Sequence, residues 1–580
     1  MKHRSLLQKL NMIFPKREQL SFVGLFFLLL VGTVFDFFSV SLILPLVNLL
    51  IDPTRMAQAS WYRLLQRLIP AQDANGLMLA LVLIVIGLYL VKNIYAVFLS
   101  ILQSTFMARN QFRTSARLLG CYLRKPYTFH LQHNTAELVR SINTDVYQTY
   151  GFINGIIHLI SNSLIALLLI VYLVLIDPLL TAAIVAGLAV YSIIYYFAVR
   201  KPMRAAGKEN RRLAIEMNKA LHQAVGGIKE VKVMGREQFF VDSFEENGRA
   251  YIANNKRYRL LSGLPRHLIE VLCVGGVLGL VAFKIGTHQA LAGIVPSLSA
   301  FGVAAIKLLP SANAINSNIN NMTYMLPSLD AVCELLEENA AESAQPEQAP
   351  DSDRFGTGGD ITLEDIRFTY PDGQAPVLQG VNLNIAHGSC VGICGVTGAG
   401  KTTLVDIILG LLEPQLGTVR YNGTDIRTDY AAWQRRIGYV PQNIYLVDES
   451  IRSNVALGVH ADEIDEARVW KALEQAQLAD FVRSLPDRLD SVVGERGIRL
   501  SGGQRQRIGI ARALYDDPEV LFLDEATSAL DYETEQAVMD AILALSGEKT
   551  CIVIAHRLTT IERCDKVYRV EDSQVFETKI

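Results

Sequence analysis

The sequence predicts two domains of different kinds, an α-helical membrane domain with six spans followed by an α/β domain. Half of the 580 residues are hydrophobic and the mean hydropathy is +0.24, which is high for a soluble protein of this size. Residues 1–340 carry 32 Lys+Arg and 19 Asp+Glu, whereas the remainder carries 23 and 38. The second part also contains a glycine-rich loop between a strand-like and a helix-like segment. We therefore expect a basic, membrane-contacting half and an acidic, cytosolic half.

Two classes of protein are disfavoured by the same composition. The excess basic residues lie between apolar segments and form no continuous patch, so nucleic acid is not an expected partner. Seven cysteines form no regularly spaced framework, which predicts reduced thiols and argues against a disulfide-rich secreted fold.

The N-terminal segment is basic with scattered apolar residues and has no small-residue cleavage site. We expect residues 1–19 to form a cytoplasmic interfacial helix that leads into the first span.

A membrane domain is predicted over residues 20–335. A span needs about 20 mostly apolar residues, and six segments meet this requirement: 20–51, 77–108, 151–176, 178–199, 263–286 and 295 to about 325. The third and fourth are separated only by the short turn "IDP". Six crossings place both ends of the domain on one side of the membrane.

The basic residues between the spans predict which side that is. The segment 109–140 carries six basic residues against one acid, and 200–266 carries 15 against 7. Both segments are therefore expected to be cytoplasmic. Because each continues a helical pattern, we expect the helices to extend beyond the membrane.

The first external loop has a helical period of its own. Trp61, Leu64, Leu65 and Leu68 recur at helical spacing, and the three arginines of the segment avoid that face. This predicts an external amphipathic helix over residues 53–70, lying either on the outer membrane surface or against the spans.

A polar, acidic linker over residues 336–359 precedes the second domain, 360–580. There, residues 395–402 have the form G-x-x-x-x-G-K-T between a buried strand and a helix. Glycines allow consecutive N–H groups to surround phosphates, Lys401 reaches the β and γ oxygens, and the Thr402 hydroxyl ligates magnesium. The motif predicts nucleotide binding.

Three further motifs fit nucleotide chemistry. The apolar run "EVLFLDE" ends in Asp524, a predicted magnesium ligand, and Glu525, which is predicted to polarise the attacking water. The alternative interpretation of this acidic pair at the end of a strand is that it caps a following helix. "LSGGQ" at 500–504 opens a helix and predicts a second anion site, used by nucleotide bound to another subunit. Gln442 and His556 are candidate sensors of the γ-phosphate.

With these motifs, residues 360–580 resemble the nucleotide-binding domain of the ATP-binding cassette family. The resemblance places "SALD" at 528–531 as the D-loop, "GERG" at 494–497 as the X-loop of exporters, and Tyr370 at the adenine-stacking position. It implies ATP and Mg²⁺ as cofactors, with Thr402, Gln442 and Asp524 as metal ligands and Glu525, Gln442 and His556 as catalytic residues. The implied ATP-binding residues are Tyr370, Gly395, Val396, Thr397, Gly398, Ala399, Gly400, Lys401, Thr402, Thr403, Gln442, Ser501, Gly502, Gly503, Gln504, Asp524 and His556.

Six spans before one cassette resemble an exporter half-transporter, which implies a homodimer with two ATP molecules between phosphate loop and signature. The segments "LILPLVNLLIDP", "LPRHLIE" and "KLLPSANAI" are similar to the PglK-type lipid-linked oligosaccharide flippases of bacterial protein N-glycosylation. This similarity implies a polyprenyl-pyrophosphate glycan as substrate, the bacterial cytoplasmic membrane as location, and Lys92, Arg266 and Lys307 as basic substrate contacts.

The depth of two lysines supports that substrate interpretation. Lys92 lies about 22 Å past Leu77, and Lys307 about 16 Å past Pro296, at 1.5 Å per helical residue. A charge at such depth costs about 2.5 to 3.5 kcal/mol, which favours contact with an anionic group. The alternatives are an ion pair of Lys92 with Asp36 or Glu270 and snorkelling by Lys307.

Arg266 follows Pro265 near the cytoplasmic end of the fifth span. There, a positive-inside anchor explains the arginine as well as a substrate contact does.

Other functions stay open at this point. The cargo could be another lipid, a hydrophobic drug or a peptide, and the cassette could gate a channel or act on DNA. Six spans argue against DNA, and Glu525 argues against a purely regulatory cassette.

In the sixth span Asn313, Asn316 and Asn320 share a helical face, with Asn321 beside it. They are expected to line an aqueous path or to bond across a dimer.

Overall fold

The computed structural model describes residues 5–42, 74–286, 295–342, 354–371, 373, 375–525, 532–543, 547–554 and 561–578. Two compact units result. The first comprises residues 1–125 and 132–345, and the second comprises residues 346–580 together with the short segment 126–131. The predicted external helix 53–70, the predicted D-loop 528–531 and His556 lie outside the described residues.

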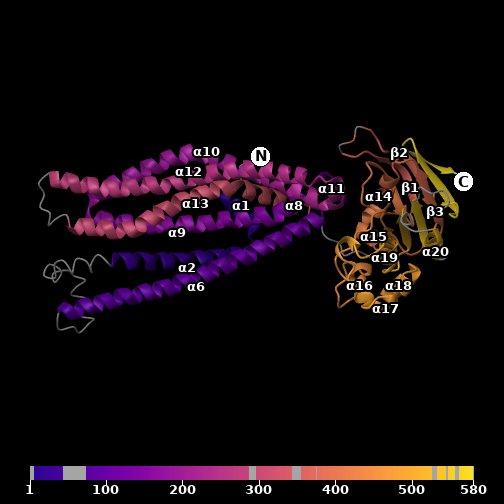
Figure 1. Cartoon of the computed structure of the whole chain (residues 1–580), viewed down its shortest axis with the longest axis horizontal. Coiled ribbons are helices and arrows are strands. Elements are labelled where there is room, and N and C mark those ends of the chain that lie inside the picture. Colours follow the sequence, from indigo (N-terminus) through magenta and orange to yellow (C-terminus); the bar gives the residue numbers. More distant parts are fainter. Residues whose placement is uncertain are drawn as a thin grey trace. The chain divides into compact units, whose positions relative to one another are not determined.

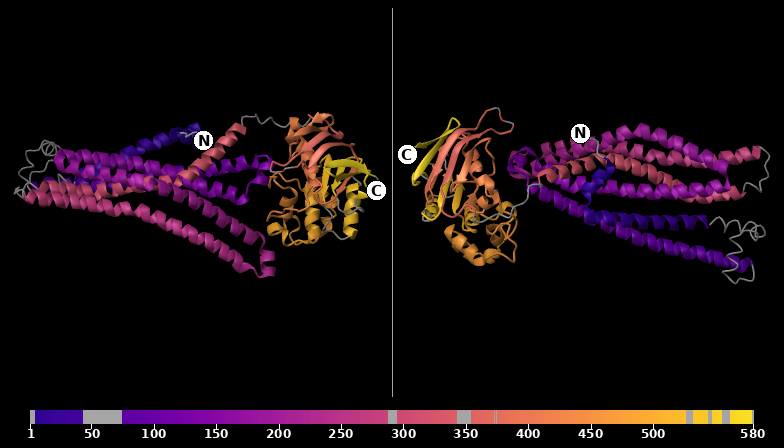
Figure 2. Two further views of the ribbon diagram at one scale, coloured as in Figure 1. Left: turned by 90° about the horizontal axis from the view of Figure 1, so that it is seen from above. Right: turned by 180° about the vertical axis from the view of Figure 1, so that it is seen from behind.

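Long helices make up the membrane domain, and they lie lengthwise beside one another in all three views (Figures 1 and 2). Helix α6 alone has 50 residues, about 75 Å at 1.5 Å per residue, whereas the hydrocarbon core of a bilayer is about 30 Å thick. Helix α6 is therefore long enough to extend beyond the membrane, as predicted for these helices. The bounds are α1 Leu6–Ile13, α2 Lys16–Ser41, α6 Ala74–Leu123, α7 Tyr127–Gln132, α8 Thr135–Arg140, the π-helical turn η1 Ser141–Asp145, α9 Val146–Ile176, α10 Pro178–Gly226, α11 Ile228–Met234, α12 Glu237–Gly286 and α13 Val295–Glu342.

The "IDP" turn joins α9 and α10 as the sequence predicted. Asp177 has extended backbone angles (φ −145°, ψ 94°) and ends α9. Pro178 is the first residue of α10, a position that suits proline because the first helical N–H has no partner in the helix.

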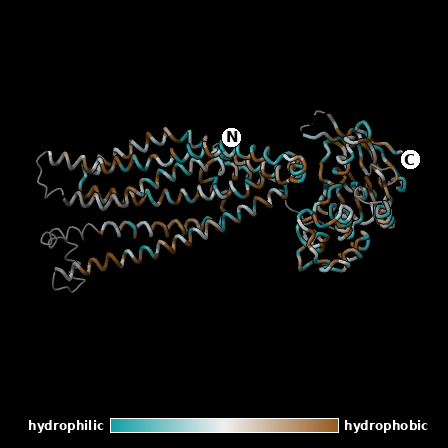
Figure 3. Tube along the Cα trace, in the orientation of Figure 1, coloured by the Kyte–Doolittle hydropathy of each residue, from teal (hydrophilic) through white to brown (hydrophobic). Residues whose placement is uncertain are grey.

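Four helical segments are long and apolar enough to cross a membrane: Lys16–Ser39, Leu79–Leu123, Thr135–Ile176 and Thr181–Gly226. Figure 3 shows the apolar stretches as brown runs along the helices of this domain. Within the described residues, α12 and α13 do not meet the same criterion, so their crossing stays a prediction.

The N-terminal segment differs from the single interfacial helix predicted over residues 1–19. A capping box between Ser5 and Gln8 starts α1, and α2 begins already at Lys16. Ile13 and Phe14 are buried among side chains of the bundle, and Lys9 pairs with Asp330 of α13. Leu6 and Leu7 of α1 stay exposed, so an interfacial location of this helix stays a prediction.

The boundary at residue 335 also differs. Helix α13 continues to Glu342, seven residues into the predicted linker. This stretch is rich in Leu, Glu and Ala, which favour helix, and Leu336 is buried in the core of the membrane domain.

Two sheets form the second unit. A six-stranded sheet has the order β10-β9-β3-β8-β7-β6, in which only β10 and β9 are antiparallel neighbours, and a four-stranded antiparallel sheet has the order β2-β1-β4-β5. The strands are β1 Ile361–Phe368, β2 Leu378–Ile385, β3 Cys390–Gly395, β4 Leu416–Tyr421, β5 Thr424–Asp425, β6 Ile437–Val440, β7 Val520–Asp524, β8 Thr550–Ile554, β9 Lys566–Glu571 and β10 Gln574–Thr578.

Side chains alternate across the larger sheet between two cores. Leu521 and Leu523 of β7 join one core, whereas Val520 and Phe522 join the other. Because successive residues of a strand point to opposite faces, a strand that is apolar throughout must be covered on both. This explains the unbroken run "VLFL".

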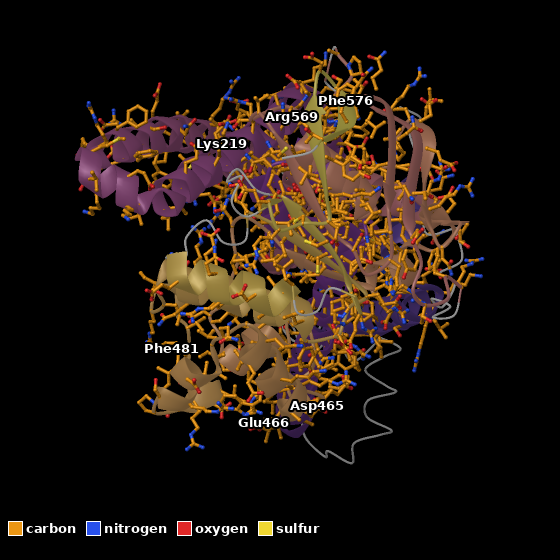
Figure 4. The ribbon with its side chains drawn as sticks, turned by 90° about the vertical axis from the view of Figure 1, so that its right-hand side faces the viewer. Lys219, Asp465, Glu466, Phe481, Arg569 and Phe576 are labelled. Carbon is orange, nitrogen blue, oxygen red and sulfur yellow. The ribbon has the colours of Figure 1, made fainter. Side chains whose placement is uncertain are left out.

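Short helices complete the unit. Asp465 caps α17 by accepting hydrogen bonds from the backbone N–H groups of Ala467 and Arg468, and Figure 4 labels it beside Glu466. Figure 4 also labels Arg569 and Phe576, which are paired in the β9–β10 register. The helices are α14 Lys401–Ile408, α15 Tyr430–Gln434, α16 Ile451–Val455, α17 Glu466–Gln475, α18 Ala479–Ser484, α19 Gly502–Leu514 and α20 Tyr532–Leu543.

Candidate functional site

The glycine-rich loop joins β3 to α14 with a backbone that only glycine can adopt without strain. Gly395 has φ +149°, and a Cβ atom there would lie 2.4 Å from the carbonyl oxygen of Val570. Gly400 has φ +104° and is the N-cap of α14. A Cβ on Gly398 would meet no described atom within 4 Å, so this part of the loop has open space beside it. The loop wraps a helix N-terminus, which is the geometry for binding phosphate.

Lys401 folds back over the loop that precedes it. Its ammonium group donates hydrogen bonds to the carbonyl oxygens of Gly395 (2.9 Å) and Val396 (3.0 Å), and the residue is only 7% exposed. Thr402 is exposed beside it. Among the described residues, the hydrogen bonds given for this buried cation go to neutral carbonyls, so it is well placed to donate to phosphate oxygens, because a charged acceptor gives a stronger hydrogen bond.

Tyr370, predicted to stack on adenine, is tied to the same loop. Its hydroxyl lies 3.1 Å from the hydroxyl of Thr403, and its ring packs edge-on against Phe368 with centroids 5.0 Å apart. The tyrosine is therefore held next to α14.

Parallel strands bring the acidic end of the site together. Strands β3, β8, β7 and β6 are consecutive neighbours, so their carboxyl ends meet at one edge of the sheet. Gly395 ends β3, Asp524 ends β7, and Gln442 follows β6. The Gln442 amide donates a 2.7 Å hydrogen bond to the Glu525 carboxylate. Two of the three predicted catalytic residues are thus in contact.

Glu525 is held in an unusual backbone conformation. Its φ is +48°, in the left-handed region, and its N–H donates to the carbonyl oxygen of Ile554 at 3.0 Å. Such a conformation costs about 1 to 3 kcal/mol and persists where the surrounding structure fixes it, often at functional sites.

Asp406 is a residue of this site that the sequence analysis missed. Burial, reinforced by the nearby Asp524 carboxylate, raises the pKa of Asp406 to about 6. The available signal was its position one turn after Thr402 on the helix that follows the phosphate loop. The two negatively charged carboxylates of Asp406 and Asp524 repel each other, so a cation bound between them would be stabilised.

The residues present fit magnesium bound together with nucleotide. No group of three His, Cys, Asp or Glu side chains suited to a metal occurs among the residues that the structure describes. Magnesium commonly uses one or two carboxylates and takes its other ligands from phosphate and water, so Asp524 and the Thr402 hydroxyl suffice on the protein side.

The "LSGGQ" segment starts α19. The Ser501 side chain accepts a hydrogen bond from the N–H of Gln504 (3.2 Å), and the Gln504 side chain accepts one from the N–H of Ser501 (2.8 Å). This capping box fixes the helix start, with Gly502 and Gly503 in the first turn. The exposed Ser501 hydroxyl lies at the positive end of a 13-residue helix.

Among the predicted substrate cations, Lys92 is in an ion pair. Its ammonium group lies 2.7 Å from an Asp36 carboxylate oxygen and 5.3 Å from the centre of the Tyr89 ring, and the lysine side chain is 11% exposed. This is the ion pair with Asp36 that the sequence left open as an alternative, and a substrate contact by Lys92 stays a prediction. Arg266 is exposed and follows the buried Pro265, and Lys307 lies on α13 with its side chain outside the described residues.

Two asparagines of α13, Asn320 and Asn321, bond to other helices of the same chain, whereas Asn316 bonds to Ala312 of α13 itself. Asn320 donates to the Tyr195 hydroxyl at 2.9 Å, and the Tyr258 hydroxyl donates to the Asn321 side chain. Asn316 borders an apolar cavity of about 400 Å³ among α9, α10, α12 and α13. For Asn320 and Asn321 these bonds join helices within one chain, and the water-lined path stays a prediction.

A second buried charge cluster was also missed. Asp145 is fully buried at the end of η1 and accepts from Arg140 (3.2 Å), Arg211 (3.1 Å) and Ser328 (2.8 Å). Arg140 is only five residues from Asp145, but Arg211 and Ser328 are 66 and 183 residues away, so no local pattern indicated the full cluster.

Comparisons with known proteins agree with this geometry. The family model described as ABC transporter transmembrane region matches residues 22–295, and the ABC transporter model matches residues 378–528. An ATP-dependent lipid A-core flippase of Ralstonia nicotianae is 32% identical over 485 residues, covering 83% of this chain and 80% of the relative. One from Salmonella typhimurium is 27% identical over 519 residues, covering 87% and 86%. A bacterial Atm1-family ABC exporter structure with ATP bound has a TM-score of 0.79 at 22% identity, covering 97% of this chain and 95% of that one.

Proposed function

Because the chain belongs to the ABC transporter family, whose members use ATP binding and hydrolysis to drive transport, we propose that it flips a glycolipid across the bacterial cytoplasmic membrane. The observation that carries the proposal is the similarity over both domains to proteins named lipid A-core flippases. By glycolipid we mean a lipid with an oligosaccharide headgroup.

Two cargoes share this chemistry. A polyprenyl-pyrophosphate glycan is supported by the membrane segments that resemble lipid-linked oligosaccharide flippases, and lipid A with its core by the names of the relatives. The ion pair of Lys92 with Asp36 weakens the case for a pyrophosphate ligand at that position. Other lipids, drugs and peptides are less well supported, because neither the sequence nor the relatives indicate them.

In the proposed ATPase cycle, different residues of the cassette bind phosphate, accept the proton of water and hold magnesium. Lys401 exchanges its two carbonyl partners for phosphate oxygens. Glu525 accepts a proton from the attacking water, and Gln442 orients the Glu525 carboxylate through their hydrogen bond. His556 would act as a further γ-phosphate contact. Magnesium, held by Thr402, Gln442 and Asp524, would neutralise charge on the phosphates.

We propose a homodimer as the working unit. The chain carries both a phosphate loop and a complete "LSGGQ" helix, so two copies would form two equivalent ATP sites by symmetric exchange. In each site the Ser501 end of α19 would face nucleotide held by the other copy.

A reconstituted flipping assay tests the function. We expect purified protein in liposomes to move a fluorescent lipid A-core, or a polyprenyl-pyrophosphate glycan, between leaflets in the presence of ATP and Mg²⁺. Protein carrying Glu525→Gln is the matched control without turnover. If the wild type hydrolyses ATP but moves neither lipid, the glycolipid assignment is wrong.

Lys92 can be tested separately from the rest of the site. A role in the ion pair predicts that Lys92→Met with Asp36→Leu keeps lipid-stimulated ATPase activity, whereas Lys92→Met alone loses stability because Asp36 is left without this partner. A role in binding substrate predicts that both variants raise the half-stimulating lipid concentration.

A further inference from the structure

A polar pocket lies between α6, α9 and α13 of the membrane domain. Its volume is about 330 Å³, within the usual range for ligand pockets. The residues that line it include no Asp, Glu, Lys or Arg. Its hydrogen-bonding side chains are mainly Ser100, Gln103 and Ser104 of α6 and Tyr147, Asn154 and His158 of α9.

These polar residues form one face on each helix. On α6, Ser100, Gln103, Ser104 and Gln111 recur at intervals of three, four and seven, and on α9 Asn154 and His158 are four apart. Another face of α6 exposes Ile94, Phe98 and Ile101, which suits contact with lipid chains. The polar face is therefore a separate, costly feature of helices that are otherwise apolar, and such features usually serve function.

Direct contacts hold the pocket in shape. The Gln103 amide donates to the Asn154 side chain at 2.6 Å and links α6 to α9. Tyr150, 3% exposed, forms part of the wall, with its hydroxyl 2.8 Å from that of Thr114. Gly151 is closely packed, since a Cβ there would lie 3.0 Å from the Met325 sulfur. The residues around the pocket are thus fixed from three helices.

The predicted depth of the pocket is the same on both helices. Ser100 lies about two turns before residue 108, where the second span is predicted to reach the cytoplasm. His158 lies about two turns after residue 151, where the third span is predicted to leave the cytoplasm. Gln111 and Tyr147, which also line the pocket, lie beyond these predicted span ends. The pocket therefore extends from the predicted cytoplasmic end of the two spans, where lipid headgroups lie, to about two turns inside them.

The chemistry of the pocket suits sugars better than phosphates. Amides and hydroxyls both donate and accept hydrogen bonds, as sugar hydroxyls require. The exposed ring of Tyr147 offers an apolar face for the C–H side of a sugar. Phosphate would call for lysine or arginine, which the lining lacks.

We propose that this pocket binds uncharged sugar residues of the glycolipid headgroup as the lipid enters from the cytoplasmic leaflet. The inference rests on the proposed function, and it assigns sugar recognition to Gln103, Asn154 and their neighbours. It applies equally to a lipid A-core and to a polyprenyl-linked glycan.

The test measures ATPase stimulation in nanodiscs by four lipids: lipid A with and without core, and polyprenyl pyrophosphate with and without glycan. For one pair, we expect the wild type to respond at a lower concentration to the lipid that carries the core or the glycan. The double variant Gln103→Leu with Asn154→Leu should raise that half-stimulating concentration about tenfold, relative to its own response to the lipid without the core or the glycan. Ser104→Val, a smaller change, should raise it about threefold.

The matched control is Asn93→Leu, an exposed asparagine of α6 whose amide donates to the Tyr89 carbonyl and which does not line the pocket. It should respond as the wild type does. If the double variant keeps the wild-type preference for sugar, the proposed pocket is wrong. It is also wrong if the double variant dissociates the dimer, as measured by light scattering, since the face is then an interface between copies. If no lipid stimulates the wild type, the proposed function itself fails.

Discussion

Glu525 shows how a single residue of the site is positioned. Its backbone is fixed by the hydrogen bond to Ile554 and its side chain by the amide of Gln442, so the carboxylate has little freedom. A general base must be held within hydrogen-bond reach of its proton, and a strained, doubly tethered residue meets that need.

We expect Glu525→Gln to bind ATP and to reduce its turnover by about 10² to 10⁴-fold, because an amide cannot accept the proton of water. Phosphate release and retention of labelled nucleotide measure the two effects. Glu548→Gln, an exposed acid in a turn, is the control and should leave turnover unchanged. Wild-type turnover in Glu525→Gln would contradict the assigned base.

Asp406 predicts a pH dependence. Because the folded-state pKa is raised to about 6, the folded protein binds this proton more tightly than the unfolded chain does. Its contribution to stability is therefore fully present below the ordinary Asp pKa and is lost as pH rises toward and through 6.

Asp406→Asn should accordingly raise the melting temperature of the nucleotide-free, metal-free protein more at pH 7.5 than at pH 5. Fluorescence of Trp433 and Trp470, both in the cassette domain, follows the transition. An equal change at the two pH values would show that the carboxyl does not titrate in this window.

At the level of elements, the packing of the membrane domain depends on a few buried polar contacts. Asp145 links the α8–α9 junction to α10 through Arg211 and to α13 through Ser328. Burial lowers the pKa of the Arg140 guanidinium, an effect that the Asp145 charge opposes. Among the residues that the structure describes, the buried Nε and Nη1 atoms of Arg140 have no hydrogen-bond partner, so the Asp145 carboxylate is the main group that stabilises the charge of Arg140.

Asp145→Ala should lower the free energy of unfolding by about 3 to 5 kcal/mol, since two guanidinium groups lose their shared partner inside the bundle. Chemical unfolding of the full protein, followed by circular dichroism, measures the change. Glu209→Ala removes an exposed carboxylate 2.7 Å from Arg212 on α10 and should change stability by no more than about 1 kcal/mol. Similar costs for the two variants would contradict the assigned role.

For the whole molecule, the arrangement of one membrane domain and one cassette makes the subunit half of a transporter. A phosphate loop and a signature helix in the same chain can complete each other only between two copies, as proposed above. Coupling between the two ATP sites is then a property of the dimer.

Co-expression of wild-type and Lys401→Ala chains tests this coupling. If one defective phosphate loop disables both sites, ATPase activity at equal expression should fall to about a quarter of the wild type, because only one random dimer in four has two intact chains. A fall to about half would mean that the chains act independently. Quantified tags on the two chains give the ratio, and Lys549→Ala, which removes an ion pair with the exposed Asp517, is the control substitution.

The sequence by itself predicted the fold class and the motif residues of the candidate site, but not Asp406. Apolar period and length predict helices and spans, and the phosphate loop requires glycines at fixed spacing, so both signals are local. The "IDP" turn and the strand before the loop were found for the same reason. Gln442 and Glu525 were each predicted as site residues from their motifs, and the hydrogen bond between them was found only in the structure.

Only the tertiary structure decided how buried polar groups are paired. Lys92 could face a substrate or a counter-ion, and the position of α2 beside α6 places Asp36 against it. The asparagines of α13, the Asp145 cluster and the polar pocket likewise depend on residues from separate helices. A helix or a phosphate loop is specified by consecutive residues. The partner of a side chain on another helix depends on how the helices pack, and no single segment of the sequence specifies that packing.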